Sequence, residues 1–489
     1  MSKILFKILI LVGLIIISKS LKAQNYNDAL LLSEPGLYTS ARALSLGNSY
    51  TARSNDFSGV LFNPAGLGFA NKLQIYAGFN LDNFDNRTTF FNNTTTANRN
   101  SINFNQFGII YPVPTVQGSL VFAVGYNRVK EFNRTLKFNG FNGNNNSMIQ
   151  AVTGEFNDEI PITNELGLAF EIRDPQTDQY IKDATLINGL LNQSGKIIKQ
   201  GNLGNWSFSS STEIAKGLML GGTFNILTGN YKSNSDFWED DTRDIYGINL
   251  ELVPGDPTTR DFQSFYINDL IEWDLSGWDA KIGILYNWKD FIKFGTTLKF
   301  PSFYTVKETF YVDSWSEFGT GVGYELNPKI VDNIKYEIKT PFEYSFGAAI
   351  AFAFASVSAD IKLINYSDME FRDGFTTEYR IARNREIENL LRTAINYNIG
   401  AEFRVPSFPM WLRIGGMYLQ SPFANDPTEY DKKYLTAGAG IELVGIFMID
   451  LGYAFGWWQD FSDNYGVNES RTYQDIYVNH LILNFSTGL

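Results

Sequence analysis

Short segments in which apolar residues alternate with polar or small ones recur from residue 72 to the end of the chain. In one of them, Leu73, Ile75, Phe79 and Leu81 are separated by polar or small residues. A period of two predicts a strand with one apolar face. About fourteen strands are expected. They cover 72–83, 102–112, 118–131, 203–214, 217–230, 277–288, 291–312, 333–354, 355–371, 391–405, 409–421, 432–444, 446–459 and 472–487.

The lengths of the connections distinguish two kinds of β protein. A soluble sandwich also has alternating strands, but it has no reason to sort its loops by length. Here long connections alternate with tight turns such as Pro112 to Thr115, Lys289-Asp290 and Pro406 to Phe408. Outer-membrane barrels combine short periplasmic turns with long external loops. The pattern therefore favours an all-β fold, a transmembrane antiparallel barrel of about fourteen strands over residues 72–489.

A stretch without this alternation precedes every strand. It runs from Ser40 to Phe69 and is rich in Gly, Ala and Ser. Small side chains bury too little apolar surface to offset the entropy of ordering, so we expect the later strands to enclose it as a plug. Asn63 and Pro64 predict a short helix with Asn as cap, and Gly66 and Gly68 would allow a tight exit. A Gly-rich surface loop is the alternative interpretation.

The first residues are typical of an export signal. Lys3 and Lys7 precede the apolar run Ile8 to Ile17, and Leu21-Lys22-Ala23 resembles a cleavage site. We therefore expect a signal peptide over 1–23, a plug or hatch over 24–71, and the barrel over 72–489.

Composition excludes several classes of function. The chain has 489 residues, a formal net charge of −12 and no cysteine, and it contains a single histidine. An acidic chain is a poor nucleic-acid binder, because such binding needs basic patches. Without cysteine and with one histidine, no metal cluster is expected and no cofactor is predicted. An outer-membrane hydrolase would need His480 as its base, but strand parity directs His480 into the lumen, away from lipid. We expect no enzyme.

The plug stretch resembles a known family. An Asn-Pro-Ala motif behind an export signal and ahead of a barrel is similar to the N-terminal hatch of the FadL/TodX family of outer-membrane transporters. Two later segments, 341–371 and 397–423, are similar to strand pairs of that family. The hatch residues that carry the resemblance are Gly47, Asp56, Asn63, Pro64, Ala65 and Gly66.

The resemblance implies a function and a setting. It implies passive transport of hydrophobic or amphipathic small molecules, such as long-chain fatty acids, by a monomeric fourteen-stranded barrel in the outer membrane of a Gram-negative bacterium. Its partners would be the lipid bilayer and the hydrophobic ligand. Family members release ligand sideways at a kinked strand, and here the alternation breaks between Gln106 and Phe107, which predicts a bulge. The alternative is a PorV-like barrel that binds exported proteins in a secretion system. A plug argues against an open aqueous porin.

Charged residues at inward parity are the candidates for ligand binding. A mixed set of charges inside a barrel usually forms a salt-bridged lining. The sharper hypothesis is that one of four cations meets a ligand carboxylate, with an apolar pocket on the plug for the tail. The four cations are Lys293, Lys299, Arg404 and Arg413, and the plug candidates are Phe57, Leu61 and Phe62.

The external connections are expected to be polar and mobile at 82–101 and 139–147, where Asn, Thr and Gly are frequent. Two others have apolar residues at helical spacing, in 183–200 and in 384–394. These stripes either pack the loops against their neighbours or form an apolar landing surface for ligand.

Overall fold

The computed structural model describes residues 25–488 apart from 38, 154–161 and 467. The predicted signal peptide, residues 1–23, lies outside the described residues. Among the described residues, no helix is both long enough and apolar enough to span a membrane.

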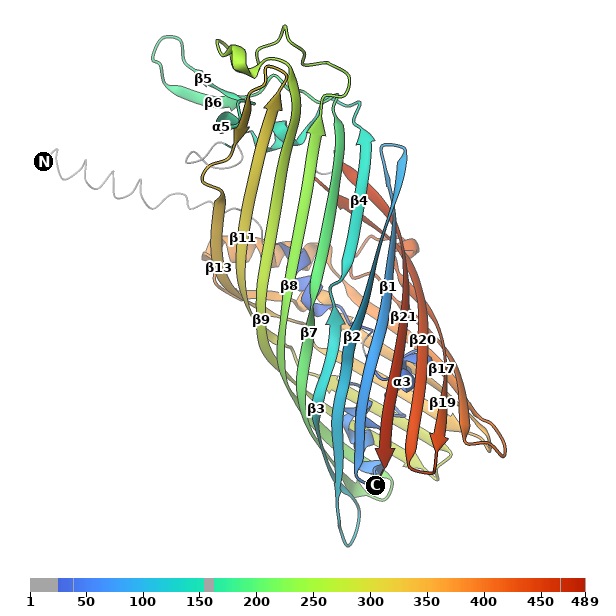
Figure 1. Ribbon diagram of the computed structural model, residues 1–489. Helices are drawn as coiled ribbons and strands as arrows, with labels where there is room; N and C mark the ends of the chain where they lie inside the picture. Colours follow the sequence, from blue (N-terminus) through green and yellow to red (C-terminus); the bar gives the residue numbers. More distant parts are fainter. Residues whose placement is uncertain (1–24, 38, 154–161, 467, 489) are drawn as a thin grey trace, which may run out of the picture.

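Nearly all of the strands belong to one antiparallel sheet (Figure 1). Only β5 (Phe170–Arg173) and β6 (Tyr180–Ala184) pair apart from it. The sheet contains β1 (Gln74–Phe90), β2 (Asn93–Val113), β3 (Leu120–Glu131), β4 (Arg134–Phe141), β7 (Asn192–Ala215), β8 (Leu218–Asp240), β9 (Phe262–Trp288), β10 (Ile292–Lys299), β11 (Phe303–Phe318), β12 (Gly323–Glu325), β13 (Ile330–Lys339), β14 (Glu343–Ala351), β15 (Ala355–Asn365), β16 (Glu370–Asp373), β17 (Thr393–Arg404), β18 (Met410–Leu419), β19 (Lys432–Leu443), β20 (Phe447–Asp463) and β21 (Arg471–Gly488).

The sheet closes on itself, because β1 pairs with both β2 and the last strand, β21. Four wall strands are interrupted: β3 with β4, β10 with β11, β13 with β14, and β15 with β16 each follow one path along the wall. Counted this way, the wall has the fourteen strands that the sequence predicts. Closure removes the free sheet edges of the wall except between the described strands β2 and β4, which form no ladder with each other, and a wall in lipid requires such closure.

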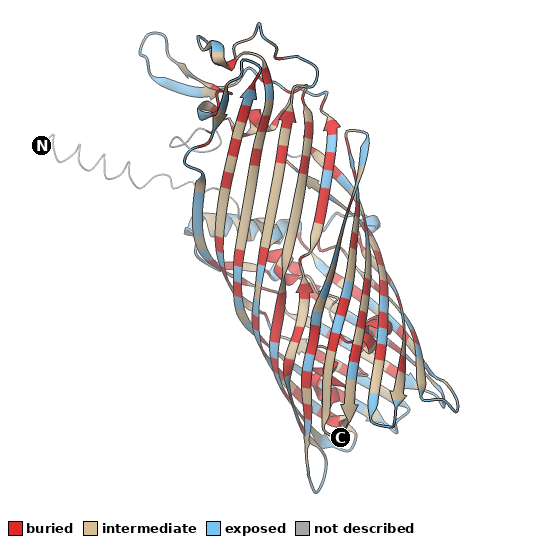
Figure 2. Cartoon of the chain, viewed as in Figure 1, coloured by how far each residue is buried: buried red, intermediate tan, exposed pale blue. Residues whose placement is uncertain are grey.

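Side chains alternate across the wall. On β8, Leu220, Phe224 and Ile226 are exposed while Met219 and Thr223 are buried, and Figure 2 shows the same alternation along other strands. The outward positions become polar further along β8. This apolar exterior is the surface that a transmembrane barrel presents to lipid.

Several strands extend further than the sequence predicts. The segment 82–101, predicted to be a mobile loop, is instead the continuation of β1 and β2 up to a turn at Phe91 and Asn92. Its Asn and Thr residues pair across the hairpin, so polarity there marks a wall that rises above the lipid rather than a flexible loop. β7, β8 and β9 are prolonged in the same way (Figure 1).

The helical patterns have mixed outcomes. No helix forms in 183–200, because that segment turns at Leu190 and enters β7. A helix does form near 384–394, where α6 (Thr377–Leu390) begins earlier than predicted. The outer end also contains α4 (Met148–Val152), α5 (Ile162–Glu165) and the 3-10 turns η3 (Pro257–Thr259), η4 (Tyr366–Asp368) and η5 (Thr428–Tyr430).

Most of the apolar residues of both patterns pack inward, while Leu186 and Leu390 are exposed. Ile187 and Leu191 join one buried apolar cluster of the outer end, and Ile387 and Leu391 join the cluster that covers the luminal helix α2. These contacts favour the packing interpretation over an apolar landing surface.

Residues 25–37 and 39–71 lie inside the barrel, and we call them the luminal segment (Figure 1, dark blue). They form α2 (Tyr26–Ser33), α3 (Ala41–Ser45), η1 (Phe57–Val60) and η2 (Pro64–Phe69). Asn63 caps η2 through a hydrogen bond from the amide of Ala65, as predicted. Gly66 and Gly68 do not form the exit of this helix. They lie within η2, where Gly66 packs on Ser54.

Candidate luminal binding site

The Asn-Pro-Ala motif fixes the luminal segment to itself and to the wall. The side-chain amide of Asn63 donates to the carbonyl of Thr51 at 2.8 Å and to that of Ile284 on β9 at 3.0 Å. Its carbonyl oxygen accepts from Ala65 at 3.1 Å. Asn63 is completely buried, so losing these partners would leave polar atoms unsatisfied.

The turns before this motif are held in a similar way. Asp56 caps η1 and accepts a hydrogen bond from the hydroxyl of Tyr50 at 2.6 Å. Gly47 has a φ of 60° and lies against the backbone of Gly416 on β18, where a side chain would collide. Among the predicted hatch residues, Asn63 and Gly47 therefore contact the wall, while Asp56 and Gly66 contact other parts of the luminal segment.

Glycines of the wall let the luminal segment approach the strands at backbone distance. A Cβ atom on Gly283 would lie 2.1 Å from Oδ1 of Asn63, and one on Gly415 would lie 2.4 Å from the amide nitrogen of Gly47. We call this set the glycine belt. It comprises Gly108, Gly125, Gly221, Gly283, Gly295, Gly347, Gly400, Gly415, Gly438 and Gly452, on ten strands of the wall.

A buried ion cluster joins the luminal segment to the wall strands β17 and β18. Glu402 contacts Arg42 at 3.2 Å, Arg53 at 2.5 Å and Arg413 at 2.7 Å. Arg413 also contacts Asp450 at 2.5 Å. Arg413 was predicted as a ligand contact, but both of its ion pairs are internal, which is the structural role that the sequence analysis gave as the alternative.

The helix α2 spans the lumen above this cluster. The ammonium group of Lys130 on β3 donates to the carbonyls of Leu31 and Glu34, and so caps the end of the helix. On the other side, Lys432 of β19 pairs with the Glu34 carboxylate at 2.7 Å. Burial alone would raise the pKa of Glu34, but Lys432 and Lys130 lower it to about 2.

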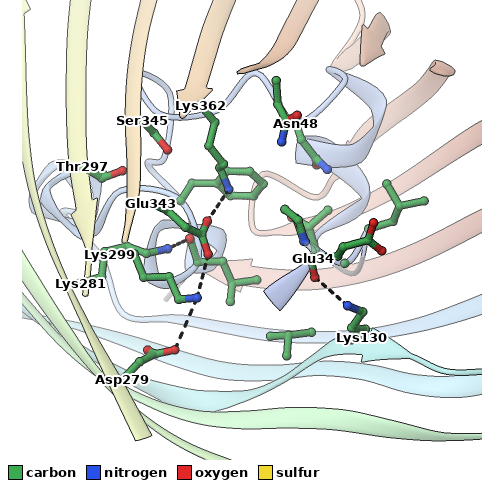
Figure 3. A pocket seen from close by; sticks show the side chains of 18 of the residues that line it. Glu34, Asn48, Lys130, Asp279, Lys281, Thr297, Lys299, Glu343, Ser345 and Lys362 are labelled. Atoms are coloured by element: carbon green, nitrogen blue, oxygen red, sulfur yellow. Dashed lines mark hydrogen bonds and ion pairs between the residues drawn. The ribbon is translucent and has the colours of Figure 1, made fainter. Parts of the chain in front are cut away.

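A cavity of about 180 Å³ lies between the end of α2 and the rest of the luminal segment (Figure 3). One side carries three lysines, Lys281, Lys299 and Lys362, grouped around Glu343. Lys299 and Lys362 pair with Glu343 at 2.8 and 3.1 Å, and Lys281 donates to the carbonyl of Leu61. With Asp279 and Asp360 also present, the cavity wall is polar and charged on this side.

The remaining lining of this cavity combines apolar side chains with polar ones such as Asn205, Asn225 and Asn398. Leu61 and Phe62 of the luminal segment, Leu203 and Leu227 of the wall, and Leu32 of α2 contribute to it. A second cavity of about 360 Å³ lies beyond α2, and its lining includes the aromatic residues Phe84, Phe132, Tyr231, Tyr366, Phe423, Trp458 and Phe461. Both cavities are lined by Glu34, Pro35, Asn396 and Leu419, so they adjoin at the end of the helix. The arrangement can hold a charged head and an apolar tail.

The wall is interrupted next to these cavities. Asn105 bulges from β2, one residue from the predicted position, because Gly78 faces Gln106 while Phe79 faces Phe104. Above this bulge, the described strands β2 and β4 form no ladder with each other, since β2 pairs with β1 and β4 pairs with β7. We call this gap in the hydrogen bonding the β2–β4 seam.

Isolated side chains bridge the seam instead of a ladder. Asn93 donates to the carbonyl of Asn139 at 2.8 Å, and Thr95 donates to that of Lys137. At the foot of the seam, Arg128 donates to the carbonyl of Phe104 at 3.3 Å. A seam held by so few bonds opens more easily than a strand pair.

The predicted ligand contacts are divided among four places. Lys299, Leu61 and Phe62 line the cavity below α2. Phe57 does not line it: its ring is fully buried against Gly108 and Gly125 and stacks on Tyr76. Lys293 and Arg404 line a different cavity on the other side of the luminal segment, and Arg413 belongs to the buried ion cluster.

Sequence reasoning missed part of the site. Lys281, Lys362 and Glu343 have the same strand parity as Lys299, and only their neighbouring strands bring them together. Glu34 and Lys130 were missed because α2 was not predicted. Its signal was present: Asn25 and Asp28 form a capping box at its start.

His480 is buried inside the wall beside Asp82, as parity predicts. In the part of the chain that the structure describes, no group of three or more His, Cys, Asp and Glu side chains is placed to hold a metal ion.

Comparison with solved structures identifies the fold. The toluene transporter TodX of P. putida aligns over 93% of this chain and 99% of its own, with a TM-score of 0.53 and 13% identity. A Pseudomonas aeruginosa FadL homologue aligns over 93% and 98%, with a TM-score of 0.57 and 11% identity. The fold is that of the FadL and TodX channels.

A third solved structure has the same fold. The monoaromatic hydrocarbon channel CymD covers 93% of this chain and 98% of its own, with a TM-score of 0.50 and 12% identity. These FadL-like neighbours are named as a transporter, a channel and a FadL homologue, and none as an enzyme. The chain matches no protein-family model and no curated protein sequence.

Proposed function

We propose that this protein passively transports hydrophobic or amphipathic small molecules, such as long-chain fatty acids, across the outer membrane of a Gram-negative bacterium. The observation that carries the proposal is the pair of adjoining cavities beside α2, one with aromatic residues in its lining and one with a lysine cluster, in a barrel whose luminal segment is bound to the wall. Solved structures with this fold include a toluene transporter and a monoaromatic hydrocarbon channel, which supports a small hydrophobic cargo.

The size of the lower cavity indicates how an amphiphile would lie. At about 180 Å³ it is smaller than the sites of about 300–1,000 Å³ that enclose whole drug-sized ligands. It would therefore take a carboxylate head, held by charge-assisted hydrogen bonds from Lys281 and its neighbours. The tail would extend past the end of α2 into the aromatic cavity.

The β2–β4 seam supplies the exit in this proposal. Val129 and Lys130 line the lower cavity and follow Arg128, which lies at the foot of the seam. The exposed aromatic residues Phe104 and Trp206 and the half-buried Tyr126 lie near this point, as expected at a membrane interface. Ligand would leave sideways when the few bonds across the seam break, while the luminal segment stays in place.

Binding by the purified barrel tests the proposal. We expect a long-chain fatty acid to bind more tightly than the alcohol of equal chain length, and Lys281→Gln to reduce this preference by about tenfold, because one charge-assisted hydrogen bond is lost. Lys232→Gln, which removes an exposed lysine from the outer wall, is the matched control. Equal binding of acid and alcohol would refute the head-group assignment.

Uptake into liposomes tests transport itself. Barrels reconstituted in liposomes should accelerate the entry of the fatty acid or of toluene without any energy source. No acceleration for either compound, combined with copurification of exported proteins from membrane extracts, would favour the PorV-like alternative.

A further inference from the structure

A third cavity lies on the opposite side of the luminal segment, toward the short turns of the barrel. It encloses about 250 Å³. The turn between β9 and β10 contributes Asp290 and Phe291, and the turn between β14 and β15 contributes Phe352 and Phe354. In a barrel of this kind the short turns face the periplasm, so this cavity opens toward that compartment. We call it the periplasmic cavity.

The periplasmic cavity is lined by more cations than carboxylates. Arg42 and Arg53 reach it from the luminal segment, and Lys293 and Arg404 reach it from the wall, against the two carboxylates of Asp290 and Glu402. This excess stands out because the whole chain is acidic, with a net charge of −12. A local positive site on an acidic protein is not explained by its average composition.

Two of these cations already have partners. Arg42 and Arg53 share the carboxylate of Glu402, and Arg53 also donates to the hydroxyl of Ser356 at 2.6 Å. Lys293 and Arg404 form no ion pair with any described residue. Each lies instead over an aromatic ring: Lys293 over Phe69 at 4.7 Å, and Arg404 over Trp411 at 5.7 Å.

The rim of the cavity indicates its level in the membrane. Phe291, Phe352 and Phe354 are each between 45% and 59% exposed. Exposed aromatic residues at the end of a barrel mark the membrane–water interface, where lipid phosphates lie. Arginine binds phosphate through two parallel hydrogen bonds, and lysine adds a compact charge.

We propose that the periplasmic cavity binds a phosphate group, through Lys293 and Arg404 with support from Arg42 and Arg53. Two sources have this chemistry, the head group of an anionic phospholipid in the inner leaflet and free inorganic phosphate. Because the cavity is formed partly by the luminal segment and partly by the wall, a bound phosphate would link the two. The site is separate from the cavities proposed for transport.

The test uses the full-length barrel in a phosphate-free nonionic detergent. One arm titrates inorganic phosphate and follows binding by calorimetry, with sodium chloride at equal ionic strength as reference. The other arm uses native mass spectrometry to detect phospholipid that stays bound after purification. The variant is Lys293→Gln with Arg404→Gln. The matched control is Lys216→Gln with Lys289→Gln, which removes two cations from neighbouring short turns outside the cavity.

We expect the wild type and the control to bind in at least one arm, and the variant to bind about tenfold more weakly or not at all, since two charged donors are lost. Binding in the first arm alone identifies free phosphate, and in the second alone identifies the lipid head group. The proposal is overturned if the wild type binds in neither arm, or if the folded variant binds as well as the control. Resistance of the barrel to SDS before heating shows whether the variant is folded.

Discussion

Replacing Glu402 by Gln should loosen the luminal segment without unfolding the barrel. The Glu402 carboxylate lies between three guanidinium groups, from Arg42 and Arg53 of the luminal segment and Arg413 of the wall. The glutamine has nearly the same shape but no charge. After the change, the three arginines would share only the carboxylate of Asp450, which contacts Arg413.

The burial of this cluster determines how much free energy the Glu402→Gln substitution costs. Side-chain exposures are 8% for Glu402, 9% for Arg53 and 1% for Arg413. Removing one partner of a buried ion pair costs about 3–5 kcal/mol, because the remaining charge is left uncompensated. Since Arg42 is 22% exposed and water can reach it, we take the lower value, about 3 kcal/mol. Each 1.4 kcal/mol is about a tenfold change in an equilibrium, so local opening should become about a hundredfold more frequent.

Hydrogen exchange measured by mass spectrometry reports this opening. Amides of residues 41–54 should exchange about a hundredfold faster in Glu402→Gln than in the wild type, while those of β8 and β9 stay unchanged. Glu272→Gln is the control, because Glu272 forms a half-exposed pair with Lys232 and such pairs contribute at most about 1 kcal/mol. Unchanged exchange at 41–54 in Glu402→Gln would show that the cluster does not hold the segment.

Two further predictions concern the same segment. Gly283→Ala should weaken the docking of the luminal segment, because the new methyl group would collide with Asn63. Gly222→Ala is the control, because the outer face of β8 has room for a methyl group at this position. Equal melting temperatures for the two variants would contradict this prediction. Burial raises the pKa of the Asp28 carboxyl group from its ordinary value of 3.8 to about 8. The hydrogen bond from the Asn25 amide opposes this shift. The contribution of Asp28 to stability is thus fully present below pH 3.8 and is lost as the pH rises through about 8. The melting temperature should therefore fall between about pH 4 and 8 and level off above that, and it should fall less in Asp28→Asn; parallel curves would refute the assignment.

The strands could be predicted well because their signal is local. The alternation of apolar and polar residues at positions such as Leu73 to Leu81 depends only on a wall with lipid on one side. The tight turn at Lys289 and Asp290 was also predicted at the correct position. Upper strand ends were missed because the wall continues beyond the lipid, where both faces are polar. Alternation disappears there although the hydrogen bonding continues, as in 82–101.

The site could be predicted only in part because it depends on contacts between distant segments. Parity gives the inward direction of Lys299, but it cannot tell which inward charges share a cavity. Phe57 was wrongly predicted to line the ligand pocket for the same reason. Its ring fills the space that Gly108 and Gly125 leave on the wall, and the residues next to Phe57 in the sequence do not indicate this contact. Buried partners such as Glu402 and Arg42 are 360 positions apart in the sequence.

The glycine belt also restricts the order in which the molecule can be assembled. Around part of the circumference the backbone of the luminal segment touches the strands directly, and elsewhere side chains such as Phe57 fill the space. A finished cylinder therefore has no clearance through which this segment could be threaded. The pairing of β1 with β21, which closes the cylinder, would then be made around an occupied interior. The barrel would then assemble by wrapping its strands around the luminal segment, and the size of this segment would set the diameter of the barrel.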